Sequence, residues 1–88
     1  MNVLFRRSFE RDLKKIRERN VLTQIHRAIE NVESANGLLS VHNLEKMSGS
    51  SGYYRIRIGD YRIGIAIDNE DIEFVRCLHR RDIYRYFP

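Results

Sequence analysis

Residues 53–67, YYRIRIGDYRIGIAI, constrain the fold more than any other part of the sequence. Apolar and polar residues alternate on both sides of the dipeptide Gly59-Asp60. Alternation with a period of two is typical of a half-buried strand, and a Gly-Asp pair between two such runs is typical of a hairpin turn. The stretch therefore predicts a β-hairpin with strands over 53–58 and 61–67.

The two-residue turn also fixes the register of this hairpin. Arg57 is expected directly opposite Arg62, with Arg55 on the same face and opposite Gly64. Like charges in directly opposed positions destabilise a sheet by roughly 0.2–1 kcal/mol per pair. Gly64 and Ala66 predict a shallow depression beside the arginines. We interpret this face as a phosphate-binding site, because guanidinium groups stay charged and donate paired hydrogen bonds. The alternative is a face that is only solvated, or paired with acids elsewhere.

A third strand is predicted over 71–78, after a turn at 68–70. The simplest register pairs Ile67 with Ile72, Ile65 with Phe74 and Arg62 with Cys77. It brings His79 onto the arginine-bearing face, and Arg80 follows it. The same register places Arg76 on the apolar face, which predicts either a β-bulge or a position at the rim of the sheet.

The N-terminal part predicts a short strand over 2–6 followed by two amphipathic helices. Ser8 is expected to cap the first helix, over 9–19, and the second covers about 21–35. Asn36-Gly37 predicts a left-handed helix end. The connection 38–52 contains the sequence SGSSG and is expected to be a flexible loop within one domain.

The composition predicts one small globular domain, 1–88, with an anionic partner. The chain has 88 residues and a net charge of +4, a balance that suits nucleic acid or an acidic protein. The single cysteine, Cys77, favours a reducing, cytoplasmic setting. No apolar stretch approaches the roughly 20 residues that span a bilayer, so no membrane partner is expected.

Two segments and the helices before them occur in the order shown by a known family. The segments are LEKMSGSSGYYRIRIGDYRIGIAID, residues 44–68, and HRRDIY, residues 79–84. They resemble the toxins of the RelE/ParE superfamily, which belong to bacterial type II toxin–antitoxin systems. The resemblance covers nearly the whole chain. It implies an α+β fold in which two N-terminal helices pack on one side of a small, mostly antiparallel four-stranded sheet, with a short C-terminal tail.

In its RelE-type branch, this family implies a ribosome-dependent mRNA endoribonuclease, or mRNA interferase. The mRNA in the ribosomal A site is cut by attack of its own 2′-hydroxyl on the adjacent phosphate, and no metal or other cofactor takes part. By this resemblance, Arg62 and Arg80 stabilise the phosphate, and Tyr84 contacts or stacks near the cleaved nucleotide. The residues expected to bind RNA phosphates are Arg55, Arg57 and Arg81.

The resemblance leaves the general base open. The best-known RelE-type enzymes carry lysines where this chain has Arg55 and Arg57, and an arginine does not give up its proton. The candidates are His79, His42 and Tyr84. His79 is favoured as a catalytic residue, because histidine changes its charge near neutral pH.

Two further activities fit the same resemblance. A ParE-like toxin inhibits DNA gyrase without catalysis, and an inactive relative binds only its antitoxin. Every one of these activities implies a cognate antitoxin whose acidic segment covers the basic face. A toxin–antitoxin heterotetramer is one assembly that the resemblance suggests.

Overall fold

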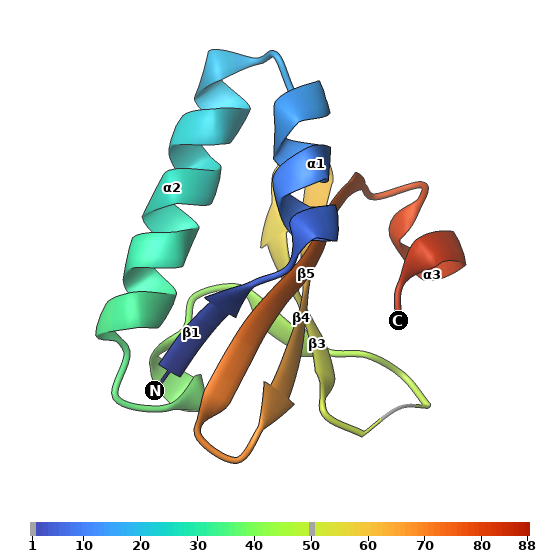
Figure 1. Ribbon diagram of the computed structural model, residues 1–88. Coiled ribbons are helices and arrows are strands. Elements are labelled where there is room, and N and C mark those ends of the chain that lie inside the picture. The colour runs from blue at the N-terminus through green and yellow to red at the C-terminus, as the bar shows by residue number, and fades with distance from the viewer. Residues whose placement is uncertain (1, 50) are drawn as a thin grey trace.

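A five-stranded sheet and two long helices make up most of this computed structural model, which describes residues 2–49 and 51–88 (Figure 1). The helices and strands are, in chain order, β1 (Asn2–Phe5), α1 (Arg7–Lys15), α2 (Arg19–Ser34), β2 (Leu44–Lys46), β3 (Tyr53–Ile58), β4 (Tyr61–Asp68), β5 (Asp71–His79) and α3 (Ile83–Tyr86). A 3-10 turn covers Leu38–Ser40. The α+β class is confirmed.

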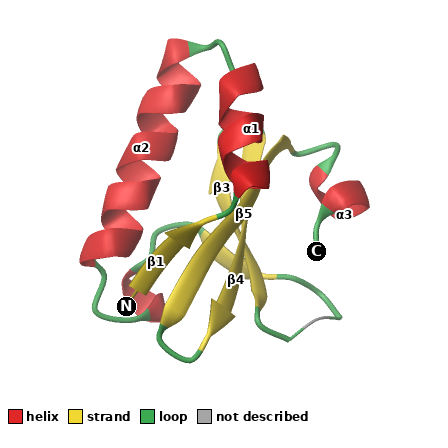
Figure 2. Cartoon of the chain, in the orientation of Figure 1, coloured by secondary structure: helices red, strands yellow, loops and turns green. Residues whose placement is uncertain are grey.

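The strand order is β1-β5-β4-β3-β2, so the strand nearest the N-terminus and the short β2 form the two edges. β1 is parallel to β5, and the other pairs are antiparallel. Figure 2 shows α1 and α2 side by side next to the sheet, while α3 lies apart from them. Across residues 2–49 and 51–88, no helix combines the length and apolar character that a membrane crossing requires.

The expectation of four strands is wrong, because part of the predicted loop 38–52 is a strand. β2 pairs with β3, and Glu45 lies opposite Arg55. Three residues are too few for alternation to be recognised in a sequence. Ser50, in the middle of the SGSSG segment, lies outside the described residues.

Both helix starts and the end of α2 differ from the sequence expectation. α1 begins at Arg7 and ends at Lys15, and Ser8 does not cap it. Instead the Ser8 hydroxyl donates a hydrogen bond to the carbonyl oxygen of Val75, at 2.6 Å. α2 ends through Ala35 in an extended conformation, and Gly37 is also extended, with φ of −178°. The predicted left-handed helix end is therefore wrong.

The main core lies between the sheet and the helix pair α1–α2. Phe9 from α1 and Ile25 and Val32 from α2 are buried against the sheet residues Ile63 and Phe74. These sheet positions belong to the alternating apolar face that the hairpin sequence predicts. The opposite face of the same strands therefore carries the arginines.

The predicted register of the first hairpin is confirmed, from Tyr54 opposite Ile65 to Arg57 opposite Arg62. The second hairpin keeps its predicted pairs only near its turn, because a bulge lies between Gly64 and Ile65. Beyond the bulge, the observed pairs are Gly64 with Arg76, Ile63 with Cys77, Arg62 with Leu78 and Tyr61 with His79. The expected pair of Arg62 with Cys77 is therefore wrong, and the bulge resolves the position of Arg76.

Among the described residues, the second half of β5 has no strand on the side opposite β4, because β1 ends opposite Phe74. Helix α1 satisfies this free edge through side chains. The Asp12 carboxylate accepts a hydrogen bond from the backbone N–H of Cys77, at 2.9 Å, and a second from the Arg76 Nε, at 2.7 Å. Asp12 is only 5% exposed. A buried carboxylate is stable only when it is paired in this way, so Asp12 and Arg76 join α1 to the sheet.

Candidate phosphate-binding site

Arg62 lies at the centre of the face of the sheet that is turned away from α1 and α2. We call this surface the arginine face and define it by Arg55, Arg57 and Arg62. Arg62 donates hydrogen bonds to the carbonyl oxygens of Gly59 and Tyr61, both at 2.8 Å. Partial burial lowers the pKa of its guanidinium, and the charges of Arg57 and Arg55 lower it further. Because arginine stays protonated even so, this cluster is a concentrated positive charge.

Arg57 is the most exposed of the three arginines, and it lies directly opposite Arg62 as expected. Among residues 2–49 and 51–88, neither Arg57 nor Arg62 forms a salt bridge with a carboxylate. Both guanidinium groups are thus available to an external anion. The structure brings together the pair that the sequence places at the centre of the site.

Arg55 differs from its neighbours, because other side chains cover most of its surface. Its Nη2 lies 3.2 Å from a carboxylate oxygen of Glu45, and the ring of Tyr84 lies over its guanidinium, 4.9 Å from the ring centroid. The Arg55 side chain is 18% exposed. Its Nε is buried without a hydrogen-bond partner within the part of the chain that the structure describes. Arg55 therefore contacts Tyr84 directly and leaves little surface for a phosphate.

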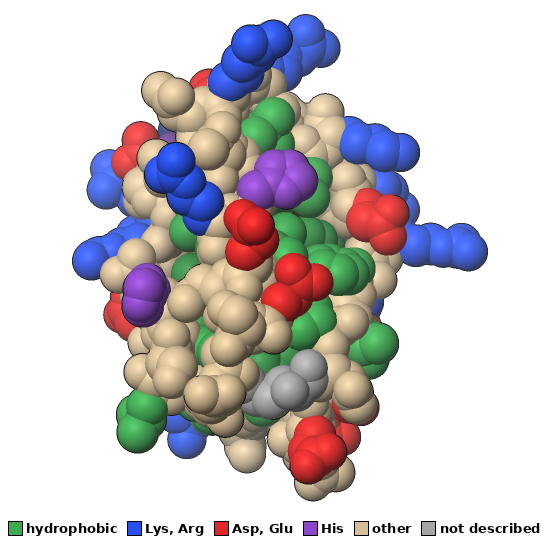
Figure 3. Space-filling view, turned by 90° about the vertical axis from the view of Figure 1, so that its left-hand side faces the viewer, with side chains coloured by type: hydrophobic (Ala, Val, Ile, Leu, Met, Phe, Trp, Pro, Cys, Tyr) green, Lys and Arg blue, Asp and Glu red, His purple; other side chains and the backbone are tan. Residues whose placement is uncertain are grey.

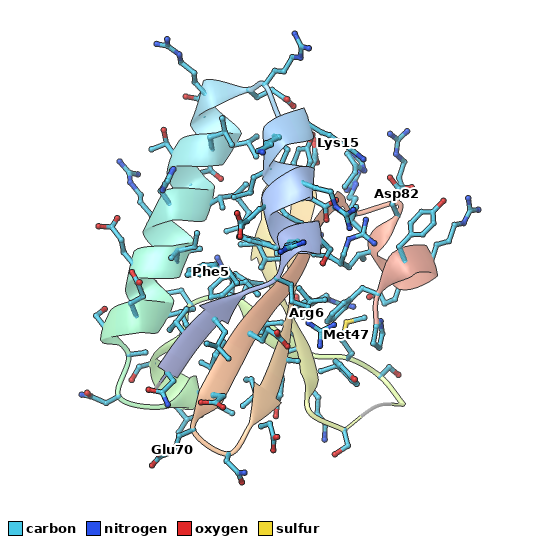
Figure 4. All side chains as sticks on the ribbon, viewed as in Figure 1. Phe5, Arg6, Lys15, Met47, Glu70 and Asp82 are labelled. Atoms are coloured by element: carbon cyan, nitrogen blue, oxygen red, sulfur yellow. The ribbon has the colours of Figure 1, made fainter. Side chains whose placement is uncertain are left out.

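The expected depression beside Gly64 is filled. Phe87, near the C-terminus, packs against Gly64 and is only 3% exposed. With Met47 and Ile83 it forms a second, small core on the arginine side of the sheet, supported by Val75 and Leu78. Figure 4 shows the Met47 side chain on the side of the sheet nearest α3. The C-terminal tail YRYFP, residues 84–88, is thus docked on the sheet through Phe87.

Arg80 and Arg81 follow β5 and are both exposed. The backbone N–H of Arg80 donates to the carbonyl oxygen of Asp60, at 2.7 Å, which holds the start of the tail against the hairpin turn. Its side chain makes a long, exposed ion pair of 4.0 Å with the Asp60 carboxylate. Arg80 also lowers the pKa of Arg62, but by less than burial, Arg57 or Arg55 does. Arg80 thus extends the positive cluster.

His79 does not join the arginine face, which corrects the expected placement. The bulge places it opposite Tyr61, whose ring it meets edge-on at 5.7 Å. Its Nδ1 accepts hydrogen bonds from the backbone N–H and the Nε of Arg81, both at 3.2 Å. It lines a cavity of about 390 Å³ with Asp12, Cys77 and Tyr86. The sheet therefore separates the His79 side chain from Arg57 and Arg62.

His42, the second histidine candidate, lies at the other side of the hairpin turn. Its backbone N–H donates to the side-chain oxygen of Asn31, at 3.0 Å, which fixes the loop to α2. The residue is exposed and lines a cavity of about 240 Å³ together with Arg57 and Gly59. Gly59 is also the residue whose carbonyl accepts a hydrogen bond from Arg62. Because Gln24, Ala28 and Asn31 of α2 line the same cavity, it lies beside β3 on the helix-covered side of the sheet, and His42 approaches the arginine pair only through Arg57.

The positive charge is unevenly distributed over the molecule. Figure 3 shows the side that lies at the left of Figure 1, where Asp and Glu side chains lie near the centre and the lower end, with Lys and Arg around the margins. Backbone, uncharged side chains and hydrophobic patches lie between the charged groups there. The arginine face, in contrast, concentrates guanidinium groups around Arg62. The arginine face is therefore a favoured surface for an anionic partner.

Comparison with known proteins gives consistent results. Residues 3–84 match the family described as "ParE toxin of type II toxin-antitoxin system, parDE". The chain is 42% identical over 89 residues to Toxin RelE3 of Methanocaldococcus jannaschii, with all of both sequences covered. Its fold matches a chain in the crystal structure of a RelB-RelE antitoxin-toxin complex from Methanococcus jannaschii, with a TM-score of 0.82, 40% identity and coverage of 97% of this chain and 99% of that one.

A more distant match shows how widely the fold is shared. The YoeB dimer from Staphylococcus aureus matches with a TM-score of 0.71 and 22% identity, over 90% of this chain and 95% of that one. This likeness concerns the fold alone. The family match and the close relative together show that the chain belongs to the RelE/ParE family of toxins from toxin–antitoxin systems.

Proposed function

We propose that this toxin is a ribosome-dependent mRNA endoribonuclease, an enzyme that cuts mRNA in the ribosomal A site. The observation that carries the proposal is the cluster around Arg62, in which Arg57 and Arg80 add positive charge. Within the described part of the chain, no salt bridge neutralises Arg57 or Arg62. Cleavage by an internal 2′-hydroxyl develops negative charge on the phosphate oxygens. Fixed guanidinium groups stabilise such charge without reorganisation.

The reaction needs a base beside the 2′-hydroxyl, cations beside the phosphate and a proton for the leaving oxygen. The 2′-oxygen forms a bond to phosphorus and gives its proton to a base, while the bond from phosphorus to the 5′-oxygen breaks and that oxygen takes up a proton from solvent. Arg57 and Arg62 bind the phosphate oxygens, and Arg80 and Arg81 bind neighbouring phosphates. Tyr84 has an exposed ring, 63% accessible, on which a base of the bound RNA can stack.

We assign the base to His42, in place of His79, which the sequence favoured. His42 shares a cavity with Arg57, whereas His79 lies across the sheet beside Tyr61 and accepts two hydrogen bonds from Arg81. A base must reach the proton that it removes, so position is decisive before acidity is considered.

Inhibition of DNA gyrase is the second candidate, because the matching family carries the description of a ParE toxin. Primer extension on mRNA translated by purified bacterial components separates the two. Cuts that need both the toxin and ribosomes, at A-site codons, support the nuclease. Undisturbed mRNA, combined with loss of supercoiling by purified gyrase, contradicts it.

The chemistry has its own test once the cut position is known. An mRNA with a 2′-deoxynucleotide on the 5′ side of that phosphate lacks the attacking hydroxyl. We expect this mRNA to remain intact on ribosomes while the all-ribose message is cut. Equal cleavage of both messages contradicts attack by the 2′-hydroxyl.

We also propose that an antitoxin with an acidic segment is the resting partner of the arginine face, in the cytoplasm. The structural relatives include an antitoxin-toxin complex, and guanidinium groups bind carboxylates as well as phosphates. An antitoxin and mRNA then compete for the same surface. Antitoxin binding that weakens steeply with salt supports recognition by these guanidinium groups.

A further inference from the structure

Phe87 occupies a notch that exists only because residue 64 is glycine. A Cβ atom added at Gly64 meets the Cγ and Cδ2 atoms of the Phe87 ring at 2.7 Å, closer than real Cβ contacts come. Tyr53 closes the notch from the side, edge-on to Phe87 with ring centroids 5.7 Å apart. The ring is therefore held on three sides, by the backbone of β4, by Tyr53 and by the small core around Met47 and Ile83.

Tyr84 lies between two anchors of this tail. Ile83, directly before it, is fully buried, and Phe87 follows three residues later. The backbone N–H of Phe87 donates to the carbonyl oxygen of Ile83, at 2.9 Å, so the two anchors form one turn of helix. Tyr84 is exposed on this turn, and its ring contacts the Arg55 guanidinium. The Phe87 ring thus fixes the turn that presents Tyr84.

One face of the Tyr84 ring contacts Arg55. The rest of the ring is exposed, so a base can stack on it from solvent. Arg55 itself is positioned by Glu45 and lies directly opposite Gly64 in the sheet. Gly64, which forms the notch, and Arg55, which lies beneath Tyr84, are thus cross-strand neighbours. Docking of Phe87 at Gly64 and contact of Tyr84 with Arg55 are two parts of one packing arrangement.

We infer that Phe87, through its seat on Gly64, is a positioning residue that holds Tyr84 over Arg55 as a stacking platform for an RNA base. This inference rests on the proposed nuclease function and adds to it how the platform is built. A small misplacement of a positioned group costs up to about 100-fold in rate. Release of the tail is therefore expected to slow cleavage by about 10- to 100-fold, without loss of the arginine pair.

Two single variants release the tail from opposite sides. Phe87→Ala removes the ring, and Gly64→Ala fills the notch while leaving the tail sequence unchanged. Gly37→Ala is the matched control, because an added Cβ there meets no atom within 4 Å. Phe87→Leu tests whether a smaller apolar anchor restores the position. The double variant Gly64→Ala/Phe87→Ala is expected to lose no more than either single variant, because both act on one contact.

Two readouts keep this inference separate from the proposed function. Nuclear Overhauser contacts between the Tyr84 ring and the Arg55 side chain report the platform without RNA. Single-turnover cleavage on programmed ribosomes reports rate separately from the concentration dependence of binding. We expect both tail variants to lose the Tyr84–Arg55 contacts and 10- to 100-fold in cleavage rate, with Gly37→Ala unchanged.

Persistence of the Tyr84–Arg55 contacts in both tail variants overturns the inference. So does full cleavage after these contacts are lost. If the wild-type toxin cuts no mRNA, the proposed function fails. The contacts in free protein then still decide whether Phe87 positions Tyr84.

Discussion

On the helix-covered side of the sheet, the charge of Asp12 is fully compensated. Arg76 donates to it at 2.7 and 3.2 Å, and the Cys77 backbone donates to it at 2.9 Å. On the arginine face, Arg62 donates to two backbone carbonyls and lies near the charges of Arg57, Arg55 and Arg80. Charge on the first side stabilises the fold. On the second side, Arg57 and Arg62 have no carboxylate partner among the described residues.

The comparison is tested most strongly by two histidines: His42 lines a cavity with Arg57, and His79 lines a cavity with Asp12. His42→Gln is expected to slow mRNA cleavage by about 10²–10⁴-fold, because it removes the proposed base. His79→Gln is the matched control and is expected to retain most of the wild-type rate. The measurement is the single-turnover rate of cleavage on ribosomes between pH 5.5 and 8. The opposite pattern, with loss only in His79→Gln, contradicts the assignment of the base.

Asp12→Ala is expected to destabilise the fold by about 2–3 kcal/mol, because the Cys77 N–H and the Arg76 guanidinium both lose their partner. Asp60→Ala removes the other kind of ion pair, the exposed 4.0 Å contact with Arg80, and is expected to cost at most about 0.5 kcal/mol. Urea denaturation gives both values. Similar losses of unfolding free energy in Asp12→Ala and Asp60→Ala contradict the view that only the buried ion pair stabilises the fold.

Cys77 gives a dependence of stability on alkaline pH. Burial raises the pKa of its thiol to about 12, and the Asp12 carboxylate adds to this. Because the folded state favours the protonated thiol, its contribution is present below pH 9, the ordinary value, and is lost as pH rises toward 12. The expected slope is about 1.4 kcal/mol per pH unit within this window. The difference in unfolding free energy between the wild type and Cys77→Ala isolates this slope, and a constant difference from pH 8 to 11 argues against it.

Arg57→Gln is expected to have the smallest effect, a gain in stability of about 0.5 kcal/mol at low salt, because it removes a like charge opposite Arg62. The gain should disappear in 1 M salt, where the Debye length is about 3 Å. Arg17→Gln, in the exposed connection between α1 and α2, serves as the control and should change little. A loss of stability in Arg57→Gln shows that the arginine pair does not repel in the free protein.

The hairpin was predictable because its signals are local. Alternation and the Gly59-Asp60 turn gave the strands and placed Arg57 opposite Arg62, as the structure confirms. The misplacement of His79 has one cause, the bulge beside Gly64, which shifts every later residue of β5 by one position. Arg76 on the apolar face was the sequence signal of that bulge, and it was open to two interpretations.

The features that the sequence did not predict depend on distant contacts. Phe87 docks on Gly64, 23 positions earlier in the chain, and Asp12 pairs with β5 residues from another element. Neither contact leaves a periodic pattern. The depression expected beside Gly64 does exist, but Phe87 of the C-terminal tail fills it.

Arg62→Ala provides the most direct test of the account, when its cleavage and its stability are measured on the same preparation. We predict a loss of about 10²–10³-fold in the rate of mRNA cleavage on ribosomes. We predict at the same time an unfolding free energy within about 1 kcal/mol of the wild type, because relief of repulsion offsets the loss of the hydrogen bonds to Gly59 and Tyr61. Wild-type cleavage by a folded Arg62→Ala protein, or a loss of cleavage explained by unfolding, contradicts the claim that this charge serves a partner.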